Sequence, residues 1–338
     1  MRPLTLKRVL WTSAALLAVL FCVVIVALKV GAYRISFADL AVNLGRLILG
    51  RRGQIPSDYL VAFGYRLPRI QLSILVGAAL SVAGAGFQAL LRNPLADPYV
   101  LGVSSGGALG AILALILLPH FLLATPLAAF VGAIATIAAV YFLGRRQGQL
   151  DSTTLLLAGI ISASFLSAMI IFLMTNTSGS NLRGMPFWLM GDLSTPLPDA
   201  MHWVLFAGLI MGVGAIYTTA ADLNLITTGE REAMHLGVEV TRVKLVVYIS
   251  ASLLTGLAVS MSGAIGYVGL LVPHVMRMIF GPDYRLLIPA SAIGGAIALL
   301  AADTLARTVM APTELPVGAV TAMAGAPLFI YLLRRRLR

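Results

Sequence analysis

Long apolar runs alternate along this chain with short segments that carry most of its charged residues. A helix needs about 20 apolar residues to cross the hydrocarbon core of a bilayer. The pattern therefore predicts an all-α polytopic membrane protein with about ten transmembrane helices, in a single domain over residues 1–338. The predicted spans are residues 9–28, 70–91, 100–118, 121–143, 153–174, 200–219, 244–264, 266–280, 286–304 and 318–333.

The composition supports a membrane protein. Apolar residues make up 59% of the chain and charged residues 11%. An average soluble domain is about one quarter charged, so a soluble fold could not cover its surface with this composition. The net charge of +11 lies mainly in short loops, where it suits anionic lipid head groups. Basic and aromatic residues do not interleave as they do on nucleic-acid surfaces, so we expect a lipid bilayer and no nucleic acid as partner.

The distribution of positive charge predicts the orientation. An even number of spans places both termini on the same side of the membrane. If that side is the cytoplasm, the inner loops and tails hold most of the 24 lysine and arginine residues. Cytoplasmic loops of membrane proteins carry such an excess. We therefore predict a multi-pass protein of the cell inner (plasma) membrane with both termini in the cytoplasm.

A weak internal repeat relates two parts of the chain, at about residues 66–174 and 242–333. Residues 98–115 align with residues 283–300 at a constant offset, so that Tyr99 matches Tyr284. Duplicated halves are common in transporters. Apolar, glycine-rich segments also match by chance, and the alternative is therefore two unrelated halves.

The loop between the sixth and seventh predicted spans is expected to form a short amphipathic helix in the cytoplasm. Thr227 followed by Glu230 has the spacing of a capping box, which satisfies free amides at the start of a helix. Ala233 and Leu236 are expected on one side of this helix, and Gly237 is placed as its C-terminal stop. The alternative is a helix lying on lipid, but its two glutamates would then face anionic head groups.

The chain has no phosphate-binding loop of the form G-x-x-x-x-G-K-[ST]. We therefore expect no nucleotide site. No His/Asp/Glu cluster or nucleophile elbow occurs in the sequence either, so we expect no enzymatic activity of its own. If ATP drives transport, a partner must bind the ATP. The segment 223–243, which contains the amphipathic helix, is the best candidate for contact with such a partner.

Several sequence blocks occur together in one order. They are NPLADP at residues 93–98, GAIGYVGLLVPHVMR at 263–277, ADTLAR at 302–307, ELPVGAVTA at 314–322 and GAP at 325–327. In this order they resemble the permease subunits of ATP-driven importers for iron chelates, haem and cobalamin, known as the FecCD family. The resemblance extends from about residue 66 to residue 327, and several ordered blocks are a much more specific signal than a lone motif.

The resemblance implies an architecture and a set of partners. The fold would be the cobalamin-permease-like type II ABC importer fold with two pseudo-repeated halves. The chain would form a homodimer, or pair with a paralogous permease, and bind two ATP-binding subunits and an extracytoplasmic substrate-binding protein. ATP and Mg would bind to the ATPase subunits, and this chain would hold no cofactor or metal.

The resemblance also assigns residues to the contact with the ATPase, in a G-acid-x-A-x-x-L-G pattern. The family often has a second acidic residue directly after the first, where this chain has Arg231. The residues assigned to this contact are Gly229, Glu230, Arg231, Glu232, Ala233, Leu236 and Gly237.

Two further groups of residues receive roles from the resemblance. Arginines at the ends of the second and ninth spans would receive acidic residues of the binding protein, because a guanidinium pairs with carboxylates in a bidentate way. These are Arg66, Arg69 and Arg307. The alternative is that they reach lipid head groups. The fifth helix would line the translocation path with Ser164, Ser167 and Asn176, although such hydroxyls can simply bond back to the preceding turn.

The function expected from the resemblance is import of a metal chelate, with ferric siderophore as the first choice and cobalamin or haem as alternatives. A transporter driven by an ion gradient is the alternative from a different class. Such a transporter needs titratable groups inside the membrane. The candidate acids Asp97, Asp151 and Asp303 are predicted to lie in loops or at span ends, which favours the ATP-driven importer.

Overall fold

The computed structural model describes residues 5–31, 33, 35, 36, 38, 39, 42, 45, 56–146, 149–177, 184–195 and 197–336. Helices make up nearly all of the regular structure in these residues. The exception is a two-residue antiparallel pair between β1 (Arg145–Arg146) and β2 (Gln149–Leu150). The prediction of an all-α fold is therefore confirmed.

Each predicted span corresponds to a helix in the described part of the chain. The helical elements are α1 (Leu6–Lys29), α3 (Ser57–Tyr59), η1 (Leu60–Arg66), α4 (Leu67–Leu90), η2 (Pro98–Leu101), α5 (Val103–Leu117), α6 (Ala124–Leu143), α7 (Ser152–Asn176), α8 (Gly184–Leu189), α9 (Asp199–Thr218), α10 (Ala220–Ile226), α11 (Glu230–His235), α12 (Val240–Ser262), α13 (Val268–Phe280), α14 (Tyr284–Ala306) and α15 (Val317–Arg336). Among the described residues, 7 helices are long and apolar enough to cross a membrane. The apolar parts of α5, α13 and α15 are shorter, at 10–17 residues.

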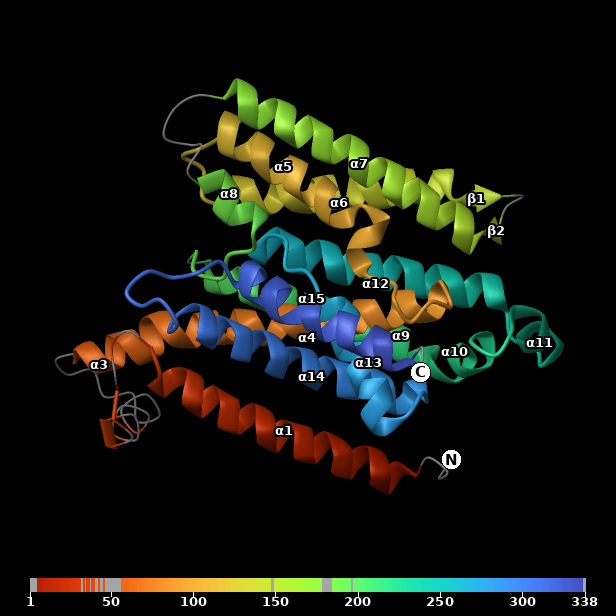
Figure 1. The fold of residues 1–338 in the computed structure, drawn as a ribbon, viewed down its shortest axis with the longest axis horizontal. Helices are drawn as coiled ribbons and strands as arrows, with labels where there is room; N and C mark the ends of the chain where they lie inside the picture. The colour runs from red at the N-terminus through yellow and green to blue at the C-terminus, as the bar shows by residue number, and fades with distance from the viewer. Residues whose placement is uncertain are drawn as a thin grey trace.

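The central helix of the bundle is α4 (Figure 1). It packs against α14, α12, α13 and α9. On one side of this centre, α5, α6 and α7 form a group, and on the opposite side α1 lies against α14. As a result, α1 and α7 present most of their side chains to the outside of the chain, whereas α4 is almost completely buried.

The helices run between two ends of the bundle, which we name after the short helices that mark them (Figure 1). The α11 end contains α10, α11, the β1–β2 pair, the start of α1 and the end of α15. The α3 end contains α3, α8 and the segment between α14 and α15. Both ends of the described chain therefore lie at the α11 end, as an even number of crossings requires.

Small residues allow the central helices to approach closely. A Cβ atom built on Gly77 of α4 would overlap the carbonyl oxygen of Gly295 in α14. A Cβ atom on Gly84, about two turns further along α4, would overlap the carbonyl oxygen of Gly269 in α13. In a regular helix the Gly269 carbonyl oxygen would accept from the N–H of residue 273. Residue 273 is proline and has no N–H, so the Gly269 oxygen has no partner of this kind within α13 and faces α4.

Candidate functional sites at the two ends of the bundle

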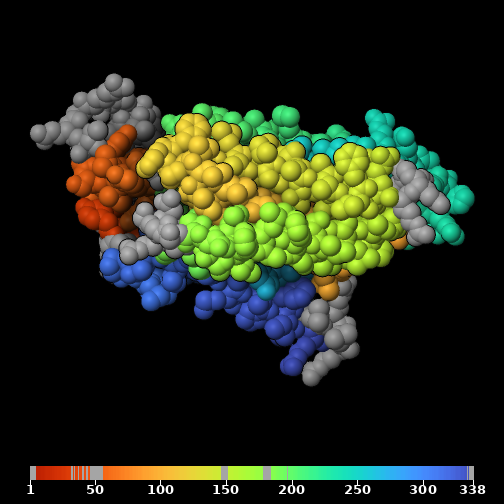
Figure 2. Space-filling model, turned by 90° about the horizontal axis from the view of Figure 1, so that it is seen from above, coloured from red at the N-terminus to blue at the C-terminus, as the bar shows by residue number. Residues whose placement is uncertain are grey.

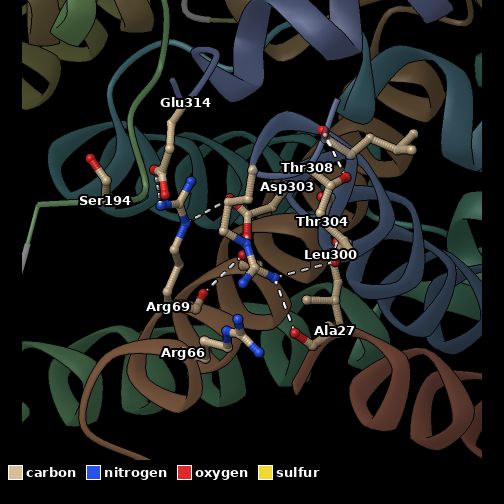
Figure 3. A network of polar contacts seen from close by, with 12 residues as sticks. Ala27, Arg66, Arg69, Ser194, Leu300, Asp303, Thr304, Thr308 and Glu314 are labelled. Carbon is tan, nitrogen blue, oxygen red and sulfur yellow. Dashed lines mark hydrogen bonds and ion pairs between the residues drawn. The ribbon is translucent and has the colours of Figure 1, made fainter. Parts of the chain in front are cut away.

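A network of charged side chains lies at the α3 end (Figure 3). Its centre is Asp303 in the last turn of α14, whose side chain has no exposed surface. The carboxylate of Asp303 lies 2.8 Å from Nε of Arg69 and 3.1 Å from Nε of Arg307. Because a buried carboxylate needs opposite charge to offset the loss of water, these two ion pairs keep Asp303 in place.

The Arg69 guanidinium extends the network to the chain between α14 and α15. Its Nη1 atom lies 2.6 Å from Oε2 of Glu314. Figure 3 shows Arg69 with Glu314 on one side and Asp303 on the other. The side chain of Glu314 is 47% exposed, so the network has one acid in the interior and one at the surface. Arg69 is therefore a bridge between the first turn of α4, the last turn of α14 and the segment that follows it.

Two arginines of the network also hold α1. Arg66 donates hydrogen bonds to the carbonyl oxygens of Leu28 (2.6 Å), Lys29 (3.2 Å) and Tyr33. Arg307 contacts the carbonyl oxygen of Ala27 at 3.4 Å. The last carbonyls of a helix lack partners within the helix and carry a partial negative charge, so positive groups stabilise them. The C-terminal end of α1 is fixed by this contact.

The three arginines of the network expose little surface. Arg66 and Arg307 are 7% and 6% exposed, and Arg69 keeps 12% of its side-chain surface. Each of them has partners within the chain, in contacts that the sequence analysis did not predict. A pocket of about 560 Å³ lies beside them, lined also by Ser194 and His202. Docking of a binding protein at this end stays a prediction.

Sequence reasoning did not pair these arginines with Asp303 and Glu314. The spacing of Asp303 and Arg307 by four residues on one helix was the available signal, since such residues lie on the same face. The contacts of Arg69 join residues 234 and 245 positions apart, and no local spacing indicates them.

The predicted amphipathic helix lies at the α11 end, but it does not begin with a capping box. The first residue before α11 is Gly229, which makes no side-chain cap. The Thr227 hydroxyl donates instead to the carbonyl oxygen of Asn224. The Glu230 carboxylate lies 2.7 Å from Nζ of the buried Lys244 in α12 and 3.7 Å from Nε of Arg92. Since Gly229 is the N-cap, Glu230 is the first residue of α11 and stands two positions too early for the N3 glutamate of a capping box, and its carboxylate pairs with Lys244 instead. The capping-box prediction is therefore wrong.

The prediction that Ala233 and Leu236 share one side of this helix is also wrong. Ala233 has no exposed surface, whereas Leu236 is 68% exposed. The reason is that α11 ends at His235, so Leu236 already belongs to the cap. Gly237 is the C-terminal stop, as predicted: it has φ +86 and donates to Met234 O at 3.0 Å, while Val238 donates to Ala233 O at 3.0 Å. This pair of bonds is a Schellman motif.

Of the seven residues assigned to the ATPase contact, four are exposed, namely Arg231, Glu232, Leu236 and Gly237, and the contact itself stays a prediction. Glu230 and Ala233 are held by the chain itself, and they are not the outermost groups. The exposed residues of α11 and its cap are Arg231, Glu232, Met234, His235, Leu236 and Gly237. Two of them, Met234 and Leu236, are large apolar side chains, exposed by 54% and 68%. Apolar groups flanked by charges beyond the spanning helices are typical of a protein contact.

Another contact at this end was missed by sequence reasoning. Asn224 of α10 donates from Nδ2 to Oδ1 of Asp283 at 2.9 Å. Its Oδ1 accepts from the backbone N–H of Tyr284, also at 2.9 Å. Asp283 is the N-cap residue of α14. One amide therefore connects the segment before α11 to the first turn of a spanning helix.

The candidate residues of the translocation path lie on α7, which crosses the face of the molecule seen in Figure 2. Ser164, Ser167 and Asn176 are exposed. The hydroxyl of Ser164 donates to Ile160 O at 3.0 Å, and Nδ2 of Asn176 donates to Phe172 O at 2.8 Å. Ser164 thus bonds back to the preceding turn, as the alternative predicted. A role in a path stays a prediction.

Asp97, between α4 and η2, gives a pH-dependent prediction. Burial raises its pKa to about 6, although a hydrogen bond from the Tyr99 N–H opposes the shift. The folded state therefore holds this proton more tightly than the unfolded state, whose carboxyl titrates near 3.8. The free energy of unfolding should fall as the pH rises through this interval, and then level off above it.

We expect Asp97→Asn to remove that part of the pH dependence, because an amide keeps the acceptor for Tyr99 and carries no charge. The measurement is the thermal midpoint of both proteins in detergent at pH 5 and pH 7.5. The wild type should lose several degrees relative to the variant between these values. Parallel behaviour of the two proteins would contradict the assignment.

The sequence matches a protein-family profile and several known permease proteins. The sequence profile described as the FecCD transport family matches residues 16–335. YvrB of Bacillus subtilis (strain 168), called an uncharacterized ABC transporter permease protein, is 44% identical over 284 residues, or 82% of this chain and 80% of that protein. The cobalamin import system permease protein BtuC of Halobacterium salinarum is 43% identical over 271 residues, or 80% of this chain and 72% of that protein.

Two further matches agree. The hemin transport system permease protein HmuU of Yersinia pestis is 41% identical over 279 residues, covering 80% of this chain and 82% of that protein. A solved structure of an inward-facing ABC transporter, assigned to the metal-chelate type, superposes with a TM-score of 0.80 and 29% identity. The superposition covers 96% of this chain and 99% of that one, so the two share one fold over nearly their whole length.

Proposed function

The chain belongs to the FecCD transport family, and from this premise we propose that it is the membrane-spanning permease subunit of an ATP-binding-cassette importer. The observation that carries this proposal is the α11 element, an exposed apolar and charged projection at the end of the bundle where both termini lie. A subunit that binds no nucleotide needs such a contact to receive work from an ATPase. Family membership supports two ATP-binding subunits as the partners at this end.

We place the α11 end in the cytoplasm of a cell with the chain in its inner membrane. The positive-inside distribution of lysine and arginine supports this orientation. The α3 end would then face outward and meet a substrate-binding protein beside the pocket of Arg66, Arg69 and Arg307. The exposed polar positions of α7 support a second permease copy, or a paralogue, on that face, with a translocation path between the two.

The cargo class follows from the relatives. Metal chelates, cobalamin and hemin are named for the related proteins, and each is a bulky compound built around a metal. We propose a cargo of this class, with ferric siderophore as the specific cargo to test first. Cobalamin or haem is the second candidate, and it is favoured by the names of two relatives that are at least 41% identical.

The test reconstitutes the chain with its cognate ATP-binding subunits and binding protein in liposomes. Uptake of ferric siderophore, cobalamin and haem is measured with and without ATP. Uptake of one of them that requires ATP supports the proposal. Uptake that follows an imposed ion gradient without ATP would overturn it in favour of a secondary transporter.

The docking role of α11 gives a separate prediction. Leu236→Asp should weaken binding of the ATP-binding subunits at least about tenfold, because a charge would replace an exposed apolar contact at the projection. Folding should not suffer, since Leu236 packs little within the chain. The measurement is the dissociation constant in nanodiscs, together with the thermal midpoint.

The matched control for Leu236→Asp is Leu122→Asp. Leu122 is also an exposed leucine outside the spanning helices, at 63%, in the segment between α5 and α6. It should leave binding within about twofold of the wild type, a difference of less than about 0.5 kcal/mol. Equal weakening in both variants would mean that general surface charge, and not α11, governs the contact.

A further inference from the structure

We propose that Asn224 is a positioning residue for energy coupling, which holds the α10–α11 element against the first turn of α14. The inference rests on the proposed role of α11 as the contact with the ATPase. Under this proposal, a displacement of α11 by the ATPase is passed to α14 through the Asn224 amide. Without the amide, the ATPase would still bind and hydrolyse ATP, but less cargo would be transported per ATP.

The two hydrogen bonds fix the orientation of the amide. Its Nδ2 atom faces a carboxylate oxygen of Asp283, which accepts, and its Oδ1 atom faces the backbone N–H of Tyr284, which donates. The amides in the first turn of a helix have no partner within the helix. Asn224 therefore supplies a second cap to α14 from a segment 60 positions earlier in the chain. Asparagine fits because it offers a donor and an acceptor side by side.

The acceptor of this contact stays ionised. The Arg285 guanidinium lies 2.7 Å and 3.0 Å from the two carboxylate oxygens of Asp283. Mainly through this hydrogen bonding, and despite partial burial, the pKa of Asp283 is lowered to about 2. A hydrogen bond to a charged acceptor is stronger than one between neutral groups. The Asn224 contact is therefore strong over the whole physiological pH range.

Other contacts hold the element together when this one is lost. Leu223 and Ile226 of α10 are each 1% exposed and belong to the main apolar core. Glu230 of α11 is paired with Lys244 of α12. The element should therefore remain folded without Asn224. What changes is its connection to α14, the helix whose opposite end carries Asp303.

The test is Asn224→Asp, a nearly isosteric change. It removes the donor and places a second carboxylate against Asp283, so the contact becomes repulsive. The matched control is Asn93→Asp at the same end of the bundle. Asn93 is exposed, and its Oδ1 accepts from the Leu95 N–H, a bond that aspartate retains. Both variants add the same charge, and only one of them breaks a contact between elements.

Three quantities are measured in the reconstituted complex: affinity for the ATP-binding subunits, ATP hydrolysis, and cargo transported per ATP. In Asn224→Asp we expect affinity within about twofold of the wild type and transport per ATP lowered at least about fivefold, the lower end of typical coupling effects. Asn93→Asp should match the wild type in all three.

A rescue separates positioning from a general structural defect. Asn224→Asp combined with Asp283→Asn removes the repulsion between two carboxylates, and the introduced amide at position 283 can donate to the introduced carboxylate at position 224. Because Asp283 Oδ1 also accepts from the Arg285 N–H, the exchange gives up that bond, and Asp283→Asn alone is the reference for its cost. Transport per ATP should recover in the double variant beyond what the two single variants predict, and non-additivity of this kind identifies a direct interaction. Normal coupling in Asn224→Asp, or no recovery in the exchange, would overturn the inference. If the wild type binds no ATP-binding subunit, the proposed function itself fails.

Discussion

Asp303→Ala is expected to lower the free energy of unfolding by about 3–5 kcal/mol, the usual cost of removing one partner from a buried ion pair. The carboxylate has no exposed surface and lies within 3.1 Å of two guanidinium nitrogens. After the change, Arg69 keeps Glu314, but Arg307 stays buried without a carboxylate. The end of α1 should loosen as well, since Arg307 contacts Ala27 O.

The measurement is unfolding of purified protein in detergent, together with the yield in membranes. The control is Asp303→Leu combined with Arg307→Met, which removes both charges and leaves Arg69 paired with Glu314. Replacing a buried ion pair by apolar groups of similar volume is often close to neutral. We therefore expect the double variant to regain most of the loss. A double variant as unstable as Asp303→Ala would show that packing, and not charge, is responsible.

Gly84→Val is the second change with a large expected effect, a loss of about 3 kcal/mol or more. A Cβ atom at this position would overlap the carbonyl oxygen of Gly269, which is backbone and cannot rotate away as a side chain can. The α4 and α13 helices would have to separate, and α4 is the centre of the bundle. The expected result is poor insertion or a markedly lower thermal midpoint.

The matched control for this change is Gly214→Val in α9. A Cβ atom there meets no atom within 4 Å, and the position also lies inside a spanning helix. Its expected effect is within about 0.5 kcal/mol, as for surface changes in general. A comparable loss at both positions would contradict a steric cause at Gly84, and helix propensity would not explain it, because valine is favoured over glycine inside a helix.

The sequence predicted the helices well because length and apolar content define a spanning helix locally. Each predicted span has its helix, including the short α13 with Pro273 inside. The family was predicted from ordered blocks, which need no spatial information. The repeat between residues 66–174 and 242–333, and the arrangement of partners, stay predictions.

The burial and the contacts of the candidate residues were predicted less well than the helices, for two physical reasons. We expected the three arginines of the charged network at the outer surface of the membrane protein. The acids that neutralise Arg69 and Arg307 were not identified, because Glu314 and Asp303 are distant from Arg69 in sequence and Asp303 was placed at a span end. On α11, the expected faces of Ala233 and Leu236 assumed a helix long enough to contain both. With 6 residues, α11 ends before Leu236, and a Schellman turn changes its direction.

The close contacts of α4 limit how this protein can move. At Gly77 and Gly84, the backbone of α4 meets carbonyl oxygens of α14 and α13 with no side chain between them. If these helices slid past one another, the side chains next to Gly77 and Gly84 on α4 would move onto the neighbouring backbone and overlap it. The close packing therefore opposes shear between the helices. If the protein alternates between inward and outward openings, we therefore expect α4, α13 and α14 to move together as one block.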